Sequence, residues 1–118
     1  MLLRASGMTR NRIHDLGIVV GAARDDGGVP HGRTLARFAE AVLGDNAGEL
    51  AAARSAVAAA LGPAGLTDAA GVVGLFNAID RVADATGIPL EPEKEAASAN
   101  IRAALGIEGF AVAARDQA

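Results

Sequence analysis

Apolar residues recur along this chain every three or four positions, the spacing that places them on one face of an α-helix. Glycine and proline divide this pattern into separate segments, and no segment repeats another. The predicted helices cover residues 11–24, 34–44, 46–62, 66–87, 92–106 and 108–115. The pattern therefore predicts an all-α fold in which residues 1–118 form a single domain, a bundle of about six helices.

The longest predicted helix, residues 66–87, has both ends marked in the sequence. Thr67 is the expected N-cap, and Gly87 ends the helix. We expect this helix to be central, with close neighbours that offset the helix-weakening Gly71 and Gly74. Its apolar positions form a wide surface expected to face the core: Val72, Val73, Leu75, Phe76, Ile79, Val82 and Ala83.

Two shorter helices precede it, residues 34–44 and 46–62. Asp45 or Asn46 is expected to cap the second of them, and Gly62 followed by proline is expected to stop it. Because the connection between these helices is short, they are predicted to pack antiparallel as an αα-hairpin.

Residues 11–24 are compatible with two structures. Their apolar residues share one helical face, but Gly17 and Gly21 bracket three β-branched residues that also read as a short buried strand. Helix is the preferred interpretation, and the strand stays open. Residues 25–33, rich in Asp, Gly and Pro, predict a loop that could serve as a hinge or lid.

Composition and charge exclude several classes of function. With 118 residues the chain can bury a core, and with three aromatic residues that core must be built from Ala, Val, Leu and Ile. A net charge of −3 with one lysine leaves no basic surface for nucleic acid. The absence of cysteine excludes disulfides, thiolate metal sites and thiol chemistry.

The first residues predict no targeting segment. Arg4 interrupts the apolar run that a signal peptide needs, and no hydrophobic window is expected to reach the roughly 18 residues of a membrane span. We therefore expect a cytoplasmic protein without a membrane segment. Met8 is an alternative start, which would leave the residues before it, and up to residue 9, as a disordered extension.

The predicted 66–87 helix also carries one polar face, formed by residues at positions i, i+3, i+4 and i+7. These candidate ligand-binding residues are Asn77, Asp80, Arg81 and Asp84. In one interpretation they are a solvated face with surface pairs worth a few tenths of a kcal/mol each. In the other, Arg81 clamps an anion and is held by Asp80 or Asp84. The solvated face is preferred, because charged helix faces are common.

His14 and His31 are the groups suited to proton transfer near neutral pH, and His14 is the candidate catalytic residue. Adjacent residues on a helix point about 100° apart, so Asp15 is not expected to orient His14. His31 lies in a turn, where an exposed or backbone-bonded histidine is expected. Two distant histidines, without metal or nucleotide motifs, predict no metal site and no cofactor.

The segments LARFAEAVL and LTDAAGVVGLFNAIDRVADATGIPL resemble the C-terminal helical half of the carboxymuconolactone decarboxylase and alkyl-hydroperoxidase-like superfamily. The resemblance covers residues 35–92, with Phe76-Asn77 and Arg81-Val82-Ala83-Asp84 at its core. It implies an all-α fold that assembles into dimers, trimers or hexamers. Peroxidases of this family use a Cys-x-x-Cys pair that the chain lacks, so thiol peroxidase activity is excluded.

We expect a non-catalytic, self-associating protein that also binds a partner or a small apolar ligand. Its Ala- and Val-rich faces favour a large, permanent interface. The alternative is a cofactor-free acid-base enzyme of decarboxylase or isomerase type acting on a small carboxylate. Arg81 would hold the anion and His14 would move the proton, which requires both to reach one cavity within or between subunits. A third possibility is a subunit that completes a site in a larger partner.

Overall fold

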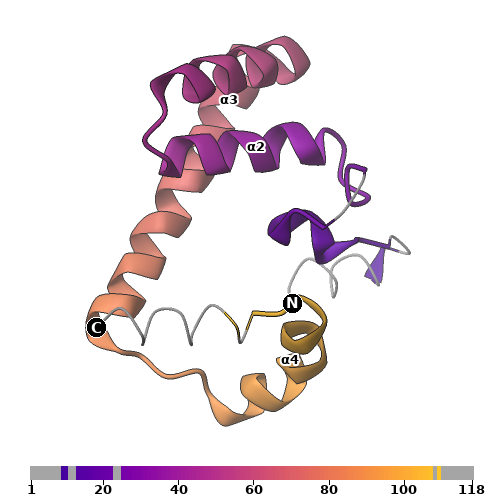
Figure 1. Cartoon of the computed structure of the whole chain (residues 1–118), viewed down its shortest axis with the longest axis vertical. Helices are drawn as coiled ribbons and strands as arrows, with labels where there is room; N and C mark the ends of the chain where they lie inside the picture. Colours follow the sequence, from indigo (N-terminus) through magenta and orange to yellow (C-terminus); the bar gives the residue numbers. More distant parts are fainter. Residues whose placement is uncertain (1–8, 11–12, 23–24, 108, 110–118) are drawn as a thin grey trace.

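The computed structural model describes residues 9–10, 13–22, 25–107 and 109, which contain helices and no strand. The elements are the 3₁₀ helix η1 (Leu16–Val20) and the α-helices α2 (Gly32–Leu43), α3 (Ala47–Thr86) and α4 (Pro92–Ala104) (Figure 1). The all-α class is confirmed, but the prediction of about six helices is wrong. The described residues form only three α-helices, because two predicted helices merge into α3 and residues 16–20 make a single 3₁₀ helix instead of a long helix or a strand.

The predicted helix over residues 108–115 falls almost wholly outside the described residues, as do residues 1–8, for which disorder was expected. The predicted 92–106 helix corresponds to α4 and ends slightly earlier.

α3 is 40 residues long and bends at Gly62, whose φ of 74° and ψ of 177° are adopted almost only by glycine. We call residues 47–61 the first arm and residues 63–86 the second arm. The predicted stop at Gly62 is thus a bend, since helical structure resumes at Pro63. The predicted N-cap Thr67 is wrong, because its hydroxyl lies inside the second arm and donates to the Pro63 carbonyl at 3.1 Å.

Several local signals at the helix ends are confirmed. The Asn46 side chain caps α3 by accepting from the backbone N–H groups of Gly48 at 3.0 Å and Glu49 at 3.1 Å. Gly87 ends α3 with a left-handed φ of 64°, and Pro92 occupies the first turn of α4. These ends depend on a few neighbouring residues, which is why the sequence predicts them well.

The core lies where α2 packs against α3, in the predicted αα-hairpin (Figure 1). Its fully enclosed residues are Phe38 and Ala41 of α2 with Ala53 and Val57 of the first arm. Partly buried side chains surround them: Val42, Leu50, Leu66 and Ala69.

The loop before α2 is tied to the segment that leads into η1. The Asp15 N–H donates to the Gly27 carbonyl at 3.0 Å, and the Asp25 carboxylate accepts from the Gly27 N–H at 2.9 Å. The Asp26 carboxylate accepts from the Arg33 N–H at 3.0 Å and so helps to start α2. A Cβ on Gly27 would lie 2.8 Å from the Asp15 carbonyl oxygen. Gly27 therefore allows the loop backbone to lie close to the backbone at Asp15.

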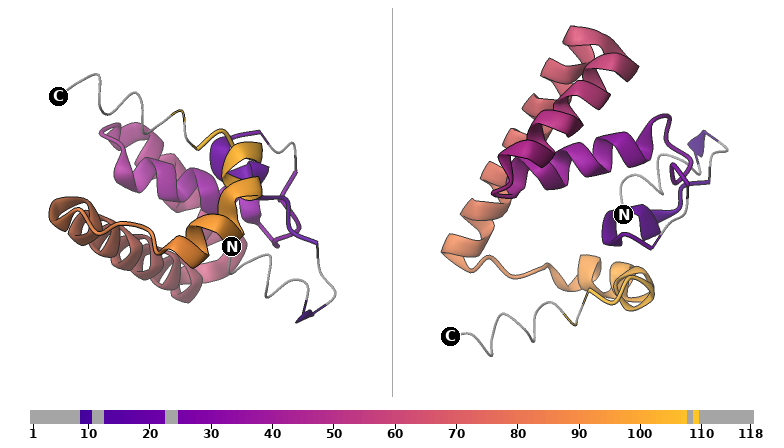
Figure 2. Two further views of the ribbon diagram at one scale, coloured as in Figure 1. Left: turned by 90° about the horizontal axis from the view of Figure 1, so that it is seen from below. Right: turned by 45° about the horizontal axis from the view of Figure 1, so that its top comes forward.

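The second arm is not the central helix that the sequence predicts. Val72, Phe76 and Ile79, expected in the core, are 56%, 59% and 53% exposed. The physical reason is a lack of neighbours: α2 covers only the first turns of the arm, and α4 lies apart from it (Figures 1 and 2). The radius of gyration of 15.7 Å exceeds the roughly 13.5 Å of a compact domain of this length.

Candidate functional site

The predicted ligand-binding residues lie together on one face of the second arm. Asp80, Arg81 and Asp84 are exposed, and Asn77 is half-buried. Across the described residues, no hydrogen bond or ion pair joins Arg81 to Asn77 or to Asp84, so the expected surface pairs do not form. This arrangement is that of a solvated helix face.

His14 is half-buried in the segment before η1. It borders a cavity of about 520 Å³ that is lined on the other side by Ile101 and Ala104 of α4 and by Leu105 directly after it. Its buried Nδ1 has no hydrogen-bond partner among the described residues. The Asp15 carboxylate accepts from the Gly17 N–H at 2.8 Å and caps η1, which agrees with the expectation that it does not orient His14.

His14 and Arg81 do not share the cavity beside His14, whose walls come from residues 13–22 and α4. The acid-base enzyme expected as the alternative function thus has no assembled site at this cavity within one chain. His31 precedes α2 in a left-handed conformation with φ 58°, is exposed, and does not cap the helix with its side chain. This position agrees with the expected turn histidine.

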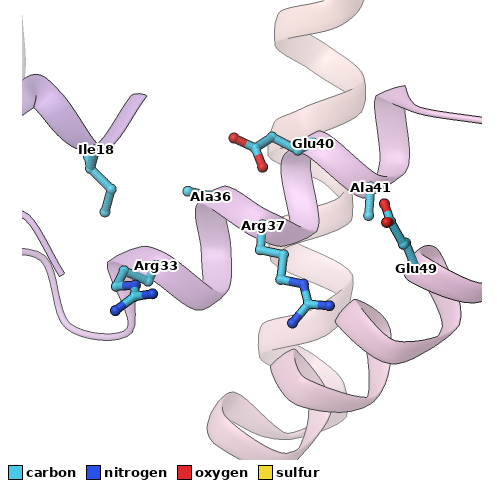
Figure 3. A pocket seen from close by; sticks show the side chains of 7 residues that line it. All are labelled: Ile18, Arg33, Ala36, Arg37, Glu40, Ala41 and Glu49. Carbon is cyan, nitrogen blue, oxygen red and sulfur yellow. The ribbon is translucent and has the colours of Figure 1, made fainter. Parts of the chain in front are cut away.

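A polar cavity beside α2 was not predicted from the sequence (Figure 3). It measures about 410 Å³, and its charged walls are Arg33, Arg37 and Glu40 of α2 with Glu49 of α3. In Figure 3 both guanidinium groups lie below α2 and the Glu40 carboxylate lies above it, so the charges do not converge. All four side chains are exposed and the signs balance, which gives the cavity no preference for anions or cations. In the sequence, the spacing of Arg33, Arg37 and Glu40 at positions i, i+4 and i+7 could have indicated that these charges share one face of a helix.

An apolar groove of about 490 Å³ lies between α2 and α3. Its walls include Leu35, Phe38 and Ala39 of α2 and Leu61, Ala69 and Val72 of α3. At Val72 the groove reaches the exposed part of the second arm. The groove and the arm therefore present one continuous apolar surface.

We call the exposed apolar surface of the second arm the α3 apolar face. It comprises Gly71, Val72, Leu75, Phe76, Ala78, Ile79 and Val82. Leu75 is 60% exposed and Val82 is 59% exposed. The whole chain exposes 8847 Å², against the roughly 5,900 Å² of a compact monomer of its mass. Contiguous apolar patches of this kind are typical of interaction sites.

Two glycines on the second arm have no packing role within the described part of the chain. A Cβ on Gly71 or Gly74 would meet no atom within 4 Å beyond its own helix. Each glycine weakens a helix by roughly 1 kcal/mol relative to alanine. The close neighbour that was expected to offset this cost is thus not supplied by the described chain.

By length and composition alone, α3 is also apolar enough to cross a membrane, contrary to the prediction from the sequence. The prediction that no hydrophobic window of this length exists is wrong, because α3 contains a window of 18 residues that is apolar on average. The helix bends at Gly62, and Asp68 lies within its apolar stretch. A charge at the bilayer centre costs about 2.5–3.5 kcal/mol. An amphipathic arm suits a partner on one side better than lipid on all sides.

The described residues contain no group of three or more His, Asp or Glu side chains that could hold a metal ion. No protein-family model, curated protein or solved structure matches the chain. The resemblance to the carboxymuconolactone decarboxylase-like superfamily therefore stays a prediction, and the geometry of α3 is the basis for assigning a function.

Proposed function

We propose that this chain is a non-catalytic, self-associating helical protein whose α3 apolar face packs against a second copy. The observation that carries the proposal is the exposure of large apolar side chains on one helix. Each of the following is more than half exposed: Val72, Leu75, Phe76, Ile79 and Val82. The resemblance of residues 35–92 to oligomeric helical proteins points the same way.

The size of the face supports association between copies. Half-exposed aliphatic and aromatic side chains each present roughly 100 Å², so the five together present on the order of 500 Å² per chain. Two copies would then bury about 1,000 Å², the smallest area typical of a specific interface. The apolar groove beside Val72 adds to this area or takes a small apolar ligand.

The polar face of the second arm supports a location in water. Asp80, Arg81 and Asp84 point away from the α3 apolar face and stay hydrated when two arms pack together. We therefore keep the cytoplasm as the proposed location, with no membrane and no nucleic acid as partners.

The proposal is tested by placing the same charge on opposite sides of the second arm. Leu75→Asp puts a carboxylate in the middle of the α3 apolar face, and Asn77→Asp puts one on the polar face. In sizing chromatography with light scattering at micromolar concentration, we expect an oligomer for the unaltered chain and for N77D, and a monomer for L75D.

Two results would contradict the proposal. One is a monomeric unaltered chain at concentrations of tens of micromolar. The other is an unaltered chain that floats with neutral phosphatidylcholine vesicles, because that would assign the α3 apolar face to lipid. Circular dichroism of L75D and N77D shows whether both keep the helical content of the unaltered chain.

A further inference from the structure

We infer that the apolar groove between α2 and α3 binds a small cationic amphiphile, a molecule with one aliphatic chain and an amine head group. Asp68 holds the amine, and the apolar walls of the groove cover the chain. Both walls of the groove belong to the same copy of the protein. The inference therefore goes beyond the proposed self-association and does not depend on it.

The shape of the groove suits a small molecule. The groove lies where α2 crosses α3 (Figure 1). Small residues leave the hollow, because Ala39 of α2 and Gly65 and Ala69 of α3 contribute little or no side chain. Leu35 and Phe38 add larger apolar walls. The volume of about 490 Å³ falls within the roughly 300–1,000 Å³ of small-molecule sites.

One charge borders this apolar groove. Among the described residues that line it, only Asp68 is charged. Asp68 is also the only charged residue between Arg54 and Asp80 in the sequence. It lies three residues after Gly65 and four before Val72, which also line the groove, so the three share one side of the helix. The single charge of a long apolar stretch thus stands at the groove.

The Asp68 carboxylate has no partner within the part of the chain that the structure describes. No hydrogen bond or ion pair joins it to another described residue, and the side chain is exposed. A carboxylate beside an apolar surface favours a ligand that joins a positive charge to an aliphatic chain. An amine donates charge-assisted hydrogen bonds to it, whereas a ligand carboxylate is repelled.

The head group is tested with three probes that share one chain: n-octylamine, n-octanol and n-octanoate. At neutral pH the amine is cationic, as the lysine side chain is. Binding is followed by NMR titration of the Leu35 and Val72 methyl groups. We expect octylamine to bind about three- to fivefold more tightly than octanol, the upper range for an exposed ion pair, and octanoate to bind most weakly.

Two variants that remove the same charge identify the carboxylate. Asp68→Asn should weaken octylamine binding about three- to fivefold and leave octanol binding unchanged. Asp84→Asn is the matched control on the polar face of the second arm, and it should leave the binding of both probes unchanged. Raising the salt concentration should weaken octylamine binding and spare octanol binding.

The aliphatic chain is tested by its length and by filling the groove. n-Hexylamine should bind more weakly than n-octylamine, by about two- to fourfold for each CH₂ that the groove covers. Ala39→Phe places a ring in the groove and should abolish binding, with circular dichroism as the check on folding. Should A39F not fold, Val72→Ala removes part of an exposed wall and should weaken binding of both octyl probes equally.

The outcomes separate this inference from the proposed function. Equal octylamine affinity in D68N and the unaltered chain would overturn the inference, as would undiminished binding to a folded A39F variant. Light scattering on the same samples reports self-association. A monomeric chain that binds octylamine through Asp68 would overturn only the proposed function, and an oligomeric chain that binds no octylamine would overturn only this inference.

Discussion

The two arms of α3 both carry many apolar residues, but only the first arm has fully buried ones. In the first arm, Ala53 and Val57 are 2% and 0% exposed, whereas in the second arm Leu75 and Ile79 are 60% and 53% exposed. The first arm follows α2 after a short turn and packs against it directly. The second arm leaves the hairpin at the Gly62 bend and meets few neighbours. Burial of an apolar helix is thus decided by the neighbours that the topology supplies.

Two phenylalanines give the largest expected contrast between the buried and the exposed apolar surfaces. Phe38 is 3% exposed in the hairpin, and Phe76 is 59% exposed on the second arm. Phe38→Ala should lower the free energy of unfolding by about 3–5 kcal/mol, the usual loss for a buried phenylalanine. Phe76→Ala should change it by less than about 0.5 kcal/mol in the monomer.

Urea unfolding measured at protein concentrations low enough to keep the chain monomeric checks this pair. Equal losses for the F38A and F76A variants would mean that the second arm is buried within the chain, and the comparison between the arms would fail.

Two glycines of α3 give an intermediate effect of opposite sign. Gly62 has a backbone conformation that is strained for any side chain, so Gly62→Ala should destabilise the chain by about 1–3 kcal/mol. Gly74 is helical with open space around it, so Gly74→Ala should stabilise the monomer by up to about 1 kcal/mol. Thermal unfolding followed by circular dichroism distinguishes the two. A G62A variant as stable as the unaltered chain would show that the fold does not depend on the backbone conformation of Gly62.

The smallest effect is expected at the start of α4. The Lys94 ammonium lies 2.9 Å from the Glu91 carboxylate, and this hydrogen bond holds the pKa of Glu91 below its ordinary value. A lowered folded-state pKa contributes stability above the unfolded-state pKa, and this contribution is lost as pH falls through the folded-state pKa. Lys94→Met should therefore raise the pKa of Glu91 in an NMR titration.

Because the Glu91 and Lys94 side chains are 64% and 65% exposed, no measurable change in melting temperature is expected for K94M. A clear loss of stability at neutral pH would contradict this expectation and show that α4 depends on the ion pair between Glu91 and Lys94.

Several helix ends follow from the sequence, whereas the packing between distant segments does not. Asn46, Gly87 and Pro92 act within one turn of their own positions, so their residue types predict the helix ends. The apolar spacing of Val72 and Ile79 predicts which residues share a face, but it carries no information on whether another helix covers that face. The prediction of a central helix failed for this reason.

The same distinction applies to the candidate site residues. The spacing of Asp80, Arg81 and Asp84 places them on one helix face, which the structure shows. The cavity beside His14 is lined in part by α4, far along the chain, and no spacing rule predicts that arrangement. Likewise, the exposure of the α3 apolar face depends on how many helices pack against it, which residue spacing does not encode.

The short turn between α2 and α3 also bears on the order of events after synthesis. Because the hairpin joins residues that are close in sequence, it is expected to fold in microseconds to milliseconds. In the proposed oligomer, pairing of two second arms would require an encounter between chains, which is slower at low concentration. Each new chain would then exist for a time as a folded monomer with its apolar helix open to other proteins. The rate of synthesis would thereby influence how much of the protein binds other proteins or aggregates before two copies pair.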